Sequence, residues 1–270
     1  MTRTISIAAS VTMLCALSAC SQSPAALKLA AKQLNAAQVG TLEVCATGRS
    51  FARTENASRE IYDVSNFIAS ADYIETAGRV QITQRQRFDP GTLHPFPVEE
   101  RADRFIAQGY AWDTVSDDTS PTVVPATQPR QSQARERLAE IWLYPQGFVR
   151  AALKHKAESK TTASGTDVAF EMDGTQYIGT IDEDGEISRV QAWIAEVDRQ
   201  PVHLDAVYSD YRDYHGVRFP RHIVRSRDGE REFELTVCSL RSGSAFEIFV
   251  PRAVEVTARA ENTARKADRG

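Results

Sequence analysis

Beyond its first twenty residues the chain lacks any apolar run long enough to cross a bilayer, which takes about 20 apolar residues in a helix. It also lacks a basic block, since 32 Lys and Arg are interspersed with 36 Asp and Glu for a net charge of −4. A nucleic-acid footprint normally requires clustered positive charge. The sequence therefore predicts a water-soluble globular body and gives no reason to expect nucleic acid as a partner.

Motifs that carry catalysis are missing as well. The chain has no Gly-x-Ser-x-Gly nucleophile elbow and no Gly-rich phosphate loop. His203, His215 and His222 are the best metal candidates, but surface or turn positions are the expected role of these side chains. Residues 182–185 (DEDG) lack the alternating ligands and distal Glu of a calcium loop, which favours an acidic hairpin tip. We therefore expect a non-catalytic protein without a metal or cofactor.

An export signal is present at the N-terminus. Arg3 is followed by a mostly apolar run over residues 5–17, which is too short for a permanent membrane helix. Residues 17–20 (LSAC) match the bacterial lipobox, in which small residues precede the cysteine that is acylated. The sequence predicts removal of residues 1–19 and acylation of Cys20. The alternatives are a secreted protein cut at an Ala-x-Ala-like site and a buried apolar helix.

Acylation would make the membrane a partner of this chain. Each buried methylene contributes about 0.8 kcal/mol, so two or three acyl chains anchor a protein durably. Ser21 stands directly after the cysteine, where an Asp would indicate retention at the inner membrane. We therefore expect a lipid-anchored protein of the cell envelope, at the outer membrane and facing the periplasm.

Only two cysteines are left in the mature chain, Cys45 and Cys238. The periplasm is oxidising, which makes them a natural pair. Residue alternation places both on the polar faces of predicted strands. Either they form a disulfide, which would stabilise the fold by roughly 4–5 kcal/mol in the chain-entropy model, or they are two unpaired thiols in distant strands.

The body of the chain alternates between strand and helix patterns. Residues 20–38 are a lipidated tether or a short helix, and residues 116–133 form a Pro-rich loop. Helical periodicity covers residues 132–156 with a break at 144–147. Residues 251–270 form a charged tail that we expect to be disordered. The predicted strands before the loop are 41–53, 60–74, 79–88 and 105–114.

Four dipeptides then separate strand-like runs. Asp173-Gly174, Asp184-Gly185, His215-Gly216 and Asp228-Gly229 are typical of tight hairpins, because Gly tolerates positive φ and Asp bonds its own backbone. The sequence predicts an α+β half-barrel over residues 39–250. In it, one curved antiparallel sheet is covered on its concave face by the helical insertion. A closed barrel is the alternative.

Several stretches resemble known families. Residues 208–220 (YSDYRDYHGVRFP) resemble a stretch of half-barrel proteins like the periplasmic lipoprotein carrier. Residues 46–51 (ATGRSF), 109–112 (GYAW) and 140–148 (EIWLYPQGF) are similar to the N-terminal region of certain exported metallo-β-lactamase-fold hydrolases, over about residues 30–250. The His-x-His-x-Asp-His cluster of those enzymes is absent, and the chain ends where their hydrolase domain would begin. The resemblance thus implies the accessory domain alone.

Aromatic residues are the remaining candidates for a site. They could line a pocket for an acyl chain or another hydrophobic ligand, or they could fill the space between sheet and helices. Two functions follow: a lipoprotein that binds a hydrophobic ligand or a partner protein, and an accessory subunit whose partner is a separately encoded metallohydrolase. The pocket candidates are Trp112, Trp142, Phe148, Phe170 and Trp193.

Overall fold

The computed structural model describes residues 24–53, 59–88, 99–115, 122–125, 132–196, 200–252, 255, 256 and 260. The predicted signal peptide and Cys20 lie outside the described residues, as do most of the predicted Pro-rich loop and most of the predicted tail. No helix among the described residues has the length and apolarity that a membrane span requires.

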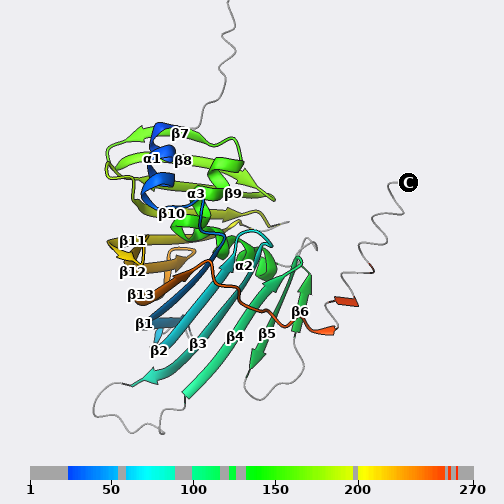
Figure 1. The fold of residues 1–270 in the computed structure, drawn as a ribbon. Coiled ribbons are helices and arrows are strands. Elements are labelled where there is room, and N and C mark those ends of the chain that lie inside the picture. The colour runs from blue at the N-terminus through cyan, green and yellow to red at the C-terminus, as the bar shows by residue number, and fades with distance from the viewer. Residues whose placement is uncertain are drawn as a thin grey trace, which may run out of the picture.

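A single open antiparallel sheet forms the body of the protein (Figure 1). Its strand order runs from β6 through β1 to β13 and on to β7, so that β6 and β7 are the two edges. The pairing of β1 with β13 joins the strands of the first half of the chain to those of the second. The strands are β1 (Thr41–Arg53), β2 (Arg59–Asp72), β3 (Ala77–Arg87), β4 (Glu99–Ala107), β5 (Tyr110–Val115), β6 (Thr122–Pro125), β7 (Glu158–Thr162), β8 (Gly165–Met172), β9 (Thr175–Ile181), β10 (Ile187–Ile194), β11 (Val202–Tyr214), β12 (Val217–Arg227) and β13 (Glu230–Ser242).

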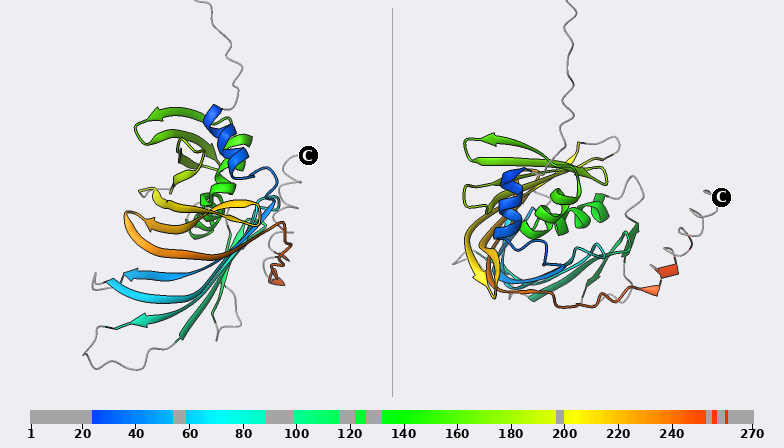
Figure 2. Two further views of the ribbon diagram at one scale, coloured as in Figure 1. Left: turned by 60° about the vertical axis from the view of Figure 1, so that its left-hand side comes forward. Right: turned by 45° about the horizontal axis from the view of Figure 1, so that its top comes forward.

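Three helices lie in the hollow of the curved sheet (Figure 2). They are α1 (Ala25–Gln33), α2 (Ser132–Leu143) and α3 (Pro145–Lys154). Pro145 occupies the first turn of α3, where its missing N–H costs nothing, so the predicted break is confined to Tyr144. The predicted fold class, a curved antiparallel sheet with helices over its concave face, is confirmed.

The hairpins follow the turn chemistry of the sequence. Asp173-Gly174, His215-Gly216 and Asp228-Gly229 have positive φ at both residues, as two-residue hairpins require. The predicted single strand over 105–114 is instead the hairpin of β4 and β5. Gln108 and Gly109, with φ of 54° and 81°, turn the chain between these strands.

Buried side chains form two clusters on opposite faces of the sheet. The main core fills the space between the sheet and the helices and includes Ala111. Trp112 belongs to a smaller cluster, which Ile248 and Val250 cover after the last strand. Because neighbouring residues of a strand point to opposite faces, this smaller cluster lies on the convex side.

Candidate functional site

The five aromatic pocket candidates do not line one cavity. Phe148 and Phe170 contact each other in the main core, with ring centroids 5.4 Å apart, and Trp142 contacts Tyr73 in the same core. Trp112 is in the convex-side cluster, where it stacks on Phe105. The Trp193 ring stacks on the His203 ring, with the ring centroids 4.7 Å apart.

Close packing accounts for the position of Phe148. A Cβ atom on Gly179 would lie 2.4 Å from the Phe148 ring, so only glycine lets the ring approach β9 this closely. The ring is fully buried. Packing of this kind leaves no room for a ligand beside Phe148.

An open groove lies in the hollow of the sheet, away from Phe148. Its volume is about 470 Å³, within the range of small-molecule sites. Strands β1, β3, β4 and β13 supply its walls, and these come from widely separated parts of the chain. Its apolar lining comes from Phe51, Ile82, Ala102 and Phe233. We call this volume the distal groove.

Polar residues along the distal groove are linked in a chain of hydrogen bonds. The Ser50 hydroxyl donates to Gln84 Oε1 at 2.6 Å, and Gln84 Nε2 donates to Glu100 at 3.2 Å. Arg101 pairs with Glu99 at the exposed rim. The Arg104 guanidinium also lines the groove, is half-buried, and has no ion pair or hydrogen bond with any other described residue. The groove thus combines an apolar wall, the carboxylates of Glu99, Glu100 and Glu232, and a guanidinium that has no polar partner within the described part of the chain.

Arg225 links the lining of the distal groove to helix α2. Its guanidinium pairs with Glu232 at 3.0 Å and with Glu140 of α2 at 3.3 Å. It also lies 4.6 Å from the ring centroid of Phe233, a cation–π distance. Arg225 is buried, and the two carboxylates raise its pKa despite the opposing effect of burial. This cation therefore stays charged and ties the helix to the sheet.

Two further ion pairs link α2 to the sheet. Glu136 accepts a hydrogen bond from Arg227 of β12 at 2.8 Å, and Arg137 pairs with Asp113 of β5 at 2.6 Å. Burial raises the pKa of the Glu136 carboxyl, with Arg227 acting in the opposite direction. Because β12 and β5 lie on either side of the hollow, these two pairs hold α2 to both sides of the sheet.

Helix α2 leaves little space beneath it. Two cavities of about 20 Å³ each lie at its sides, one beside Ile141 and the other beside Leu143. Each has room for about one water molecule. A ligand of more than a few atoms therefore does not fit beneath α2 unless the helix moves. Besides the distal groove, the described residues form an open pocket of about 590 Å³ beside Tyr73, Trp142 and His155.

The two cysteines lie on neighbouring strands as free thiols. Cys45 of β1 pairs with Ser239, and the register shift at this point leaves Cys238 as the extra residue of a β-bulge. Cys238 is exposed, and its Sγ lies 3.8 Å from the Thr47 hydroxyl. The two strands that carry the cysteines are therefore neighbours and not distant from each other. A disulfide between Cys45 and Cys238 stays a prediction.

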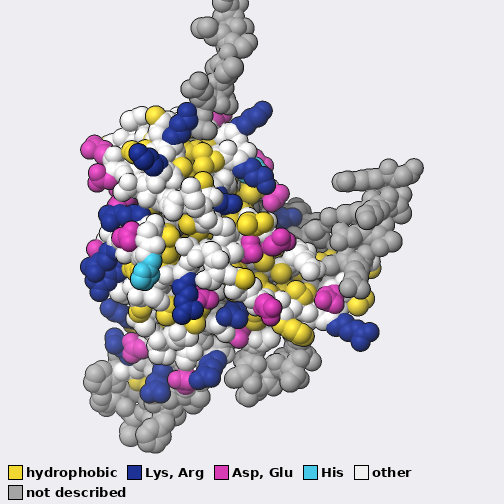
Figure 3. All heavy atoms as spheres, viewed as in Figure 1, with side chains coloured by type: hydrophobic (Ala, Val, Ile, Leu, Met, Phe, Trp, Pro, Cys, Tyr) yellow, Lys and Arg dark blue, Asp and Glu magenta, His cyan; other side chains and the backbone are white. Residues whose placement is uncertain are grey.

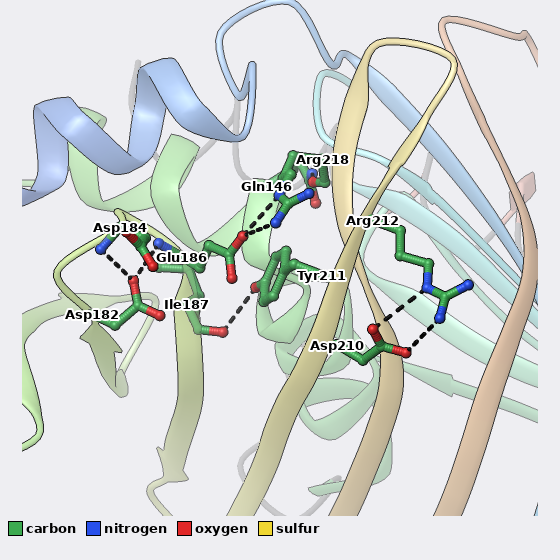
Figure 4. Close-up of polar contacts among 9 residues, drawn as sticks. All are labelled: Gln146, Asp182, Asp184, Glu186, Ile187, Asp210, Tyr211, Arg212 and Arg218. Atoms are coloured by element: carbon green, nitrogen blue, oxygen red, sulfur yellow. Dashed lines mark hydrogen bonds and ion pairs between the residues drawn. The ribbon is translucent and has the colours of Figure 1, made fainter.

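The acidic and histidine candidates have structural partners. Asp182 accepts hydrogen bonds from the backbone N–H of Asp184 and Glu186, which closes the hairpin tip (Figure 4). His203 bonds Gln191 at 3.0 Å, and His222 contacts Thr236. His215 occupies a turn with φ of 55°. Within the described ranges no three His, Cys, Asp or Glu residues are grouped as metal ligands.

Residues that carry the family resemblances also have structural roles. Tyr208 donates to the Leu143 carbonyl at 2.7 Å and Tyr211 to the Ile187 carbonyl at 2.8 Å, so both fix the fold (Figure 4 shows Tyr211). Gly109 forms a turn. A Cβ on Gly147 would lie 2.6 Å from the Tyr73 ring.

No protein-family model matches the chain, and no curated protein matches it in sequence. Among solved structures, it is similar to a DUF1329 family protein from Desulfovibrio piger, with 11% identity, a TM-score of 0.45, and coverage of 85% of this chain and 98% of that one. It is also similar to a LolA superfamily protein from Nitrosomonas europaea, with 9% identity, a TM-score of 0.45, and coverage of 80% and 94%.

Proposed function

We propose that this chain is a non-catalytic lipoprotein of the cell envelope that binds an apolar ligand with an anionic head in the distal groove. The observation that carries this proposal is the lining of the groove, where Ile82, Ala102 and Phe233 lie beside an Arg104 guanidinium that has no polar partner among the described residues. Apolar contacts favour an acyl chain, and a guanidinium matches a carboxylate or phosphate.

Binding in the groove can be tested by displacement of an uncharged apolar dye, N-phenylnaphthylamine, with laurate or dodecanol. Ile82→Glu places a charge on the apolar wall, and we expect it to weaken dye binding at least tenfold. Thr83→Glu is the matched control, because the next residue of β3 faces the opposite side of the sheet. Ala102→Trp should block the groove without adding charge.

Arg104 provides the second readout of the same experiment. Laurate should displace the dye at a lower concentration than dodecanol, and Arg104→Leu should abolish that difference while dodecanol binds as before. Thermal melts of each variant separate loss of binding from loss of folding. Unchanged dye binding by folded Ile82→Glu and Ala102→Trp proteins would refute the groove as the site.

The lipid anchor is tested separately at Cys20. We expect the Cys20→Ser protein to leave the membrane fraction at 0.5 M salt, because it lacks acyl chains and salt screens surface charge. The wild-type protein should stay in that fraction. A Cys20→Ser protein that still sedimented wholly with membranes would contradict acylation as the anchor.

The accessory-subunit hypothesis stays a prediction from the resemblance. Its test is co-purification with a separately encoded metallohydrolase.

A further inference from the structure

The described lysines lie at one end of the molecule. The chain has six lysines, and five of them lie in residues 28–32 and 154–160. Lys28 and Lys32 are on α1, Lys154 ends α3, Lys156 lies in the turn that follows, and Lys160 is in β7. Helices α1 and α3 contact each other, and β7 is the edge strand of the same end (Figure 1).

All five lysines are exposed and unpaired. Every ion pair found among the described residues uses Arg or His, and none of these five ammonium groups has a hydrogen-bond partner there. Two apolar side chains accompany them: Leu29 is 43% exposed and Leu153 is 40% exposed. In Figure 3, Lys and Arg side chains surround a hydrophobic area at this end. We call these five lysines with Leu29 and Leu153 the lysine face.

The distance from the lysine face to the anchor is fixed by chain length. Four residue steps join Cys20 to Pro24, immediately before α1, and they span at most about 14 Å in any conformation. If Cys20 is acylated, α1 therefore lies near the lipid headgroups. At physiological salt, charges act over about 8 Å, and a tether this short lets the lysines on α1 come that close to a charged surface.

We propose that the lysine face binds anionic phospholipid headgroups and sets the orientation of the protein on the membrane. This inference rests on the proposed acylation of Cys20. Lysine suits this role because its ammonium is a hydrated point charge on a flexible stem, whereas many of the described arginines form directed ion pairs. Leu29 and Leu153 can enter the interface beside the lysine stems.

Acidic residues border the lysine face without neutralising its lysines by contact. A Cβ on Gly185 would lie 2.8 Å from the Leu29 side chain, so the hairpin tip with Asp182 and Asp184 lies beside α1. Asp182 is occupied by backbone N–H groups. The strands that line the distal groove, β1, β3, β4 and β13, lie in the part of the sheet away from α1 and β7 (Figure 1).

The experiment measures how tightly the unacylated chain binds to vesicles. The chain used begins at Ser21, so it contains every described residue. The vesicles hold phosphatidylglycerol and phosphatidylethanolamine at 3:7, or phosphatidylcholine alone. Although removal of residues 1–19 leaves a net charge of −5, we expect binding only to the anionic vesicles, with loss at 0.5 M salt. Each lysine near such a surface contributes about fivefold, so Lys28→Glu with Lys32→Glu should weaken binding at least 20-fold.

Arg49→Glu with Arg85→Glu is the matched control. Both residues are exposed on β1 and β3, away from the lysine face, and the pair makes the same change in net charge. If both double variants lose binding equally, or if the wild-type chain ignores anionic vesicles, the proposal is overturned. Acyl groups on Cys20, detected by mass spectrometry, would still support the anchor in that case.

Discussion

Replacing Arg225 with Met is expected to lower the free energy of unfolding by about 3–5 kcal/mol, the usual cost of removing one partner from a buried ion pair. The substitution leaves Glu140 and Glu232 facing each other without a cation, at 15% and 26% side-chain exposure. It also removes the guanidinium from the Phe233 ring. Urea unfolding followed by circular dichroism measures this change.

Two further variants make the Arg225 prediction specific. Arg231→Met removes an exposed pair with Glu234 and should cost less than about 1 kcal/mol. Adding Glu140→Gln and Glu232→Gln to Arg225→Met should restore part of the lost stability, because no unpaired charge stays behind. An Arg225→Met protein as stable as Arg231→Met would show that the buried pair does not hold α2.

Alkaline pH is expected to unfold the protein cooperatively above pH 10. Burial raises the pKa of seven tyrosine hydroxyls, with that of Tyr62 raised to about 12. The folded state therefore holds these protons after the unfolded state has released them. Stability falls as pH rises through 10, by about 1.4 kcal/mol for each unit of pKa difference per group. The affected residues are Tyr62, Tyr73, Tyr144, Tyr177, Tyr208, Tyr211 and Tyr214.

Absorbance at 295 nm reports tyrosinate and can be recorded together with circular dichroism. The two signals should change together, because most of these phenols ionise only when the core opens. In 6 M guanidinium chloride the tyrosines should titrate near pH 10. Smooth ionisation near pH 10 with the fold intact would contradict the burial of Tyr208 and Tyr211.

Local chemistry made most of the fold predictable. The strand over Thr41–Arg53 and the helix over Ser132–Leu143 have the predicted bounds, because alternation and helical periodicity are properties of short segments. Strand β4 was missed since residues 99–104 (EERADR) are mostly charged and lack an apolar face. The Gln108-Gly109 turn was the local signal that could have revealed it.

The candidate site was much less predictable. The distal groove combines Ser50, Ile82 and Phe233, which the sheet brings together across more than 180 residues of chain. Arg225 and Glu140 meet for the same reason, 85 positions apart. Charged residues at positions 136, 137 and 140 of the predicted helix were the available hint of ion pairs with the sheet. Only the sheet register identifies their partners.

The pairing of the first strand with the last has a consequence for biosynthesis. Strand β1 cannot complete its hydrogen bonds until Glu230–Ser242 has been made, so the middle of the sheet closes late. Contacts so distant in sequence slow folding. A ribosome-bound or translocating chain that lacks β13 would expose β1 and β12 as unsatisfied edges, which are templates for aggregation. We expect such a chain to benefit from a holding chaperone until its last strand has been made.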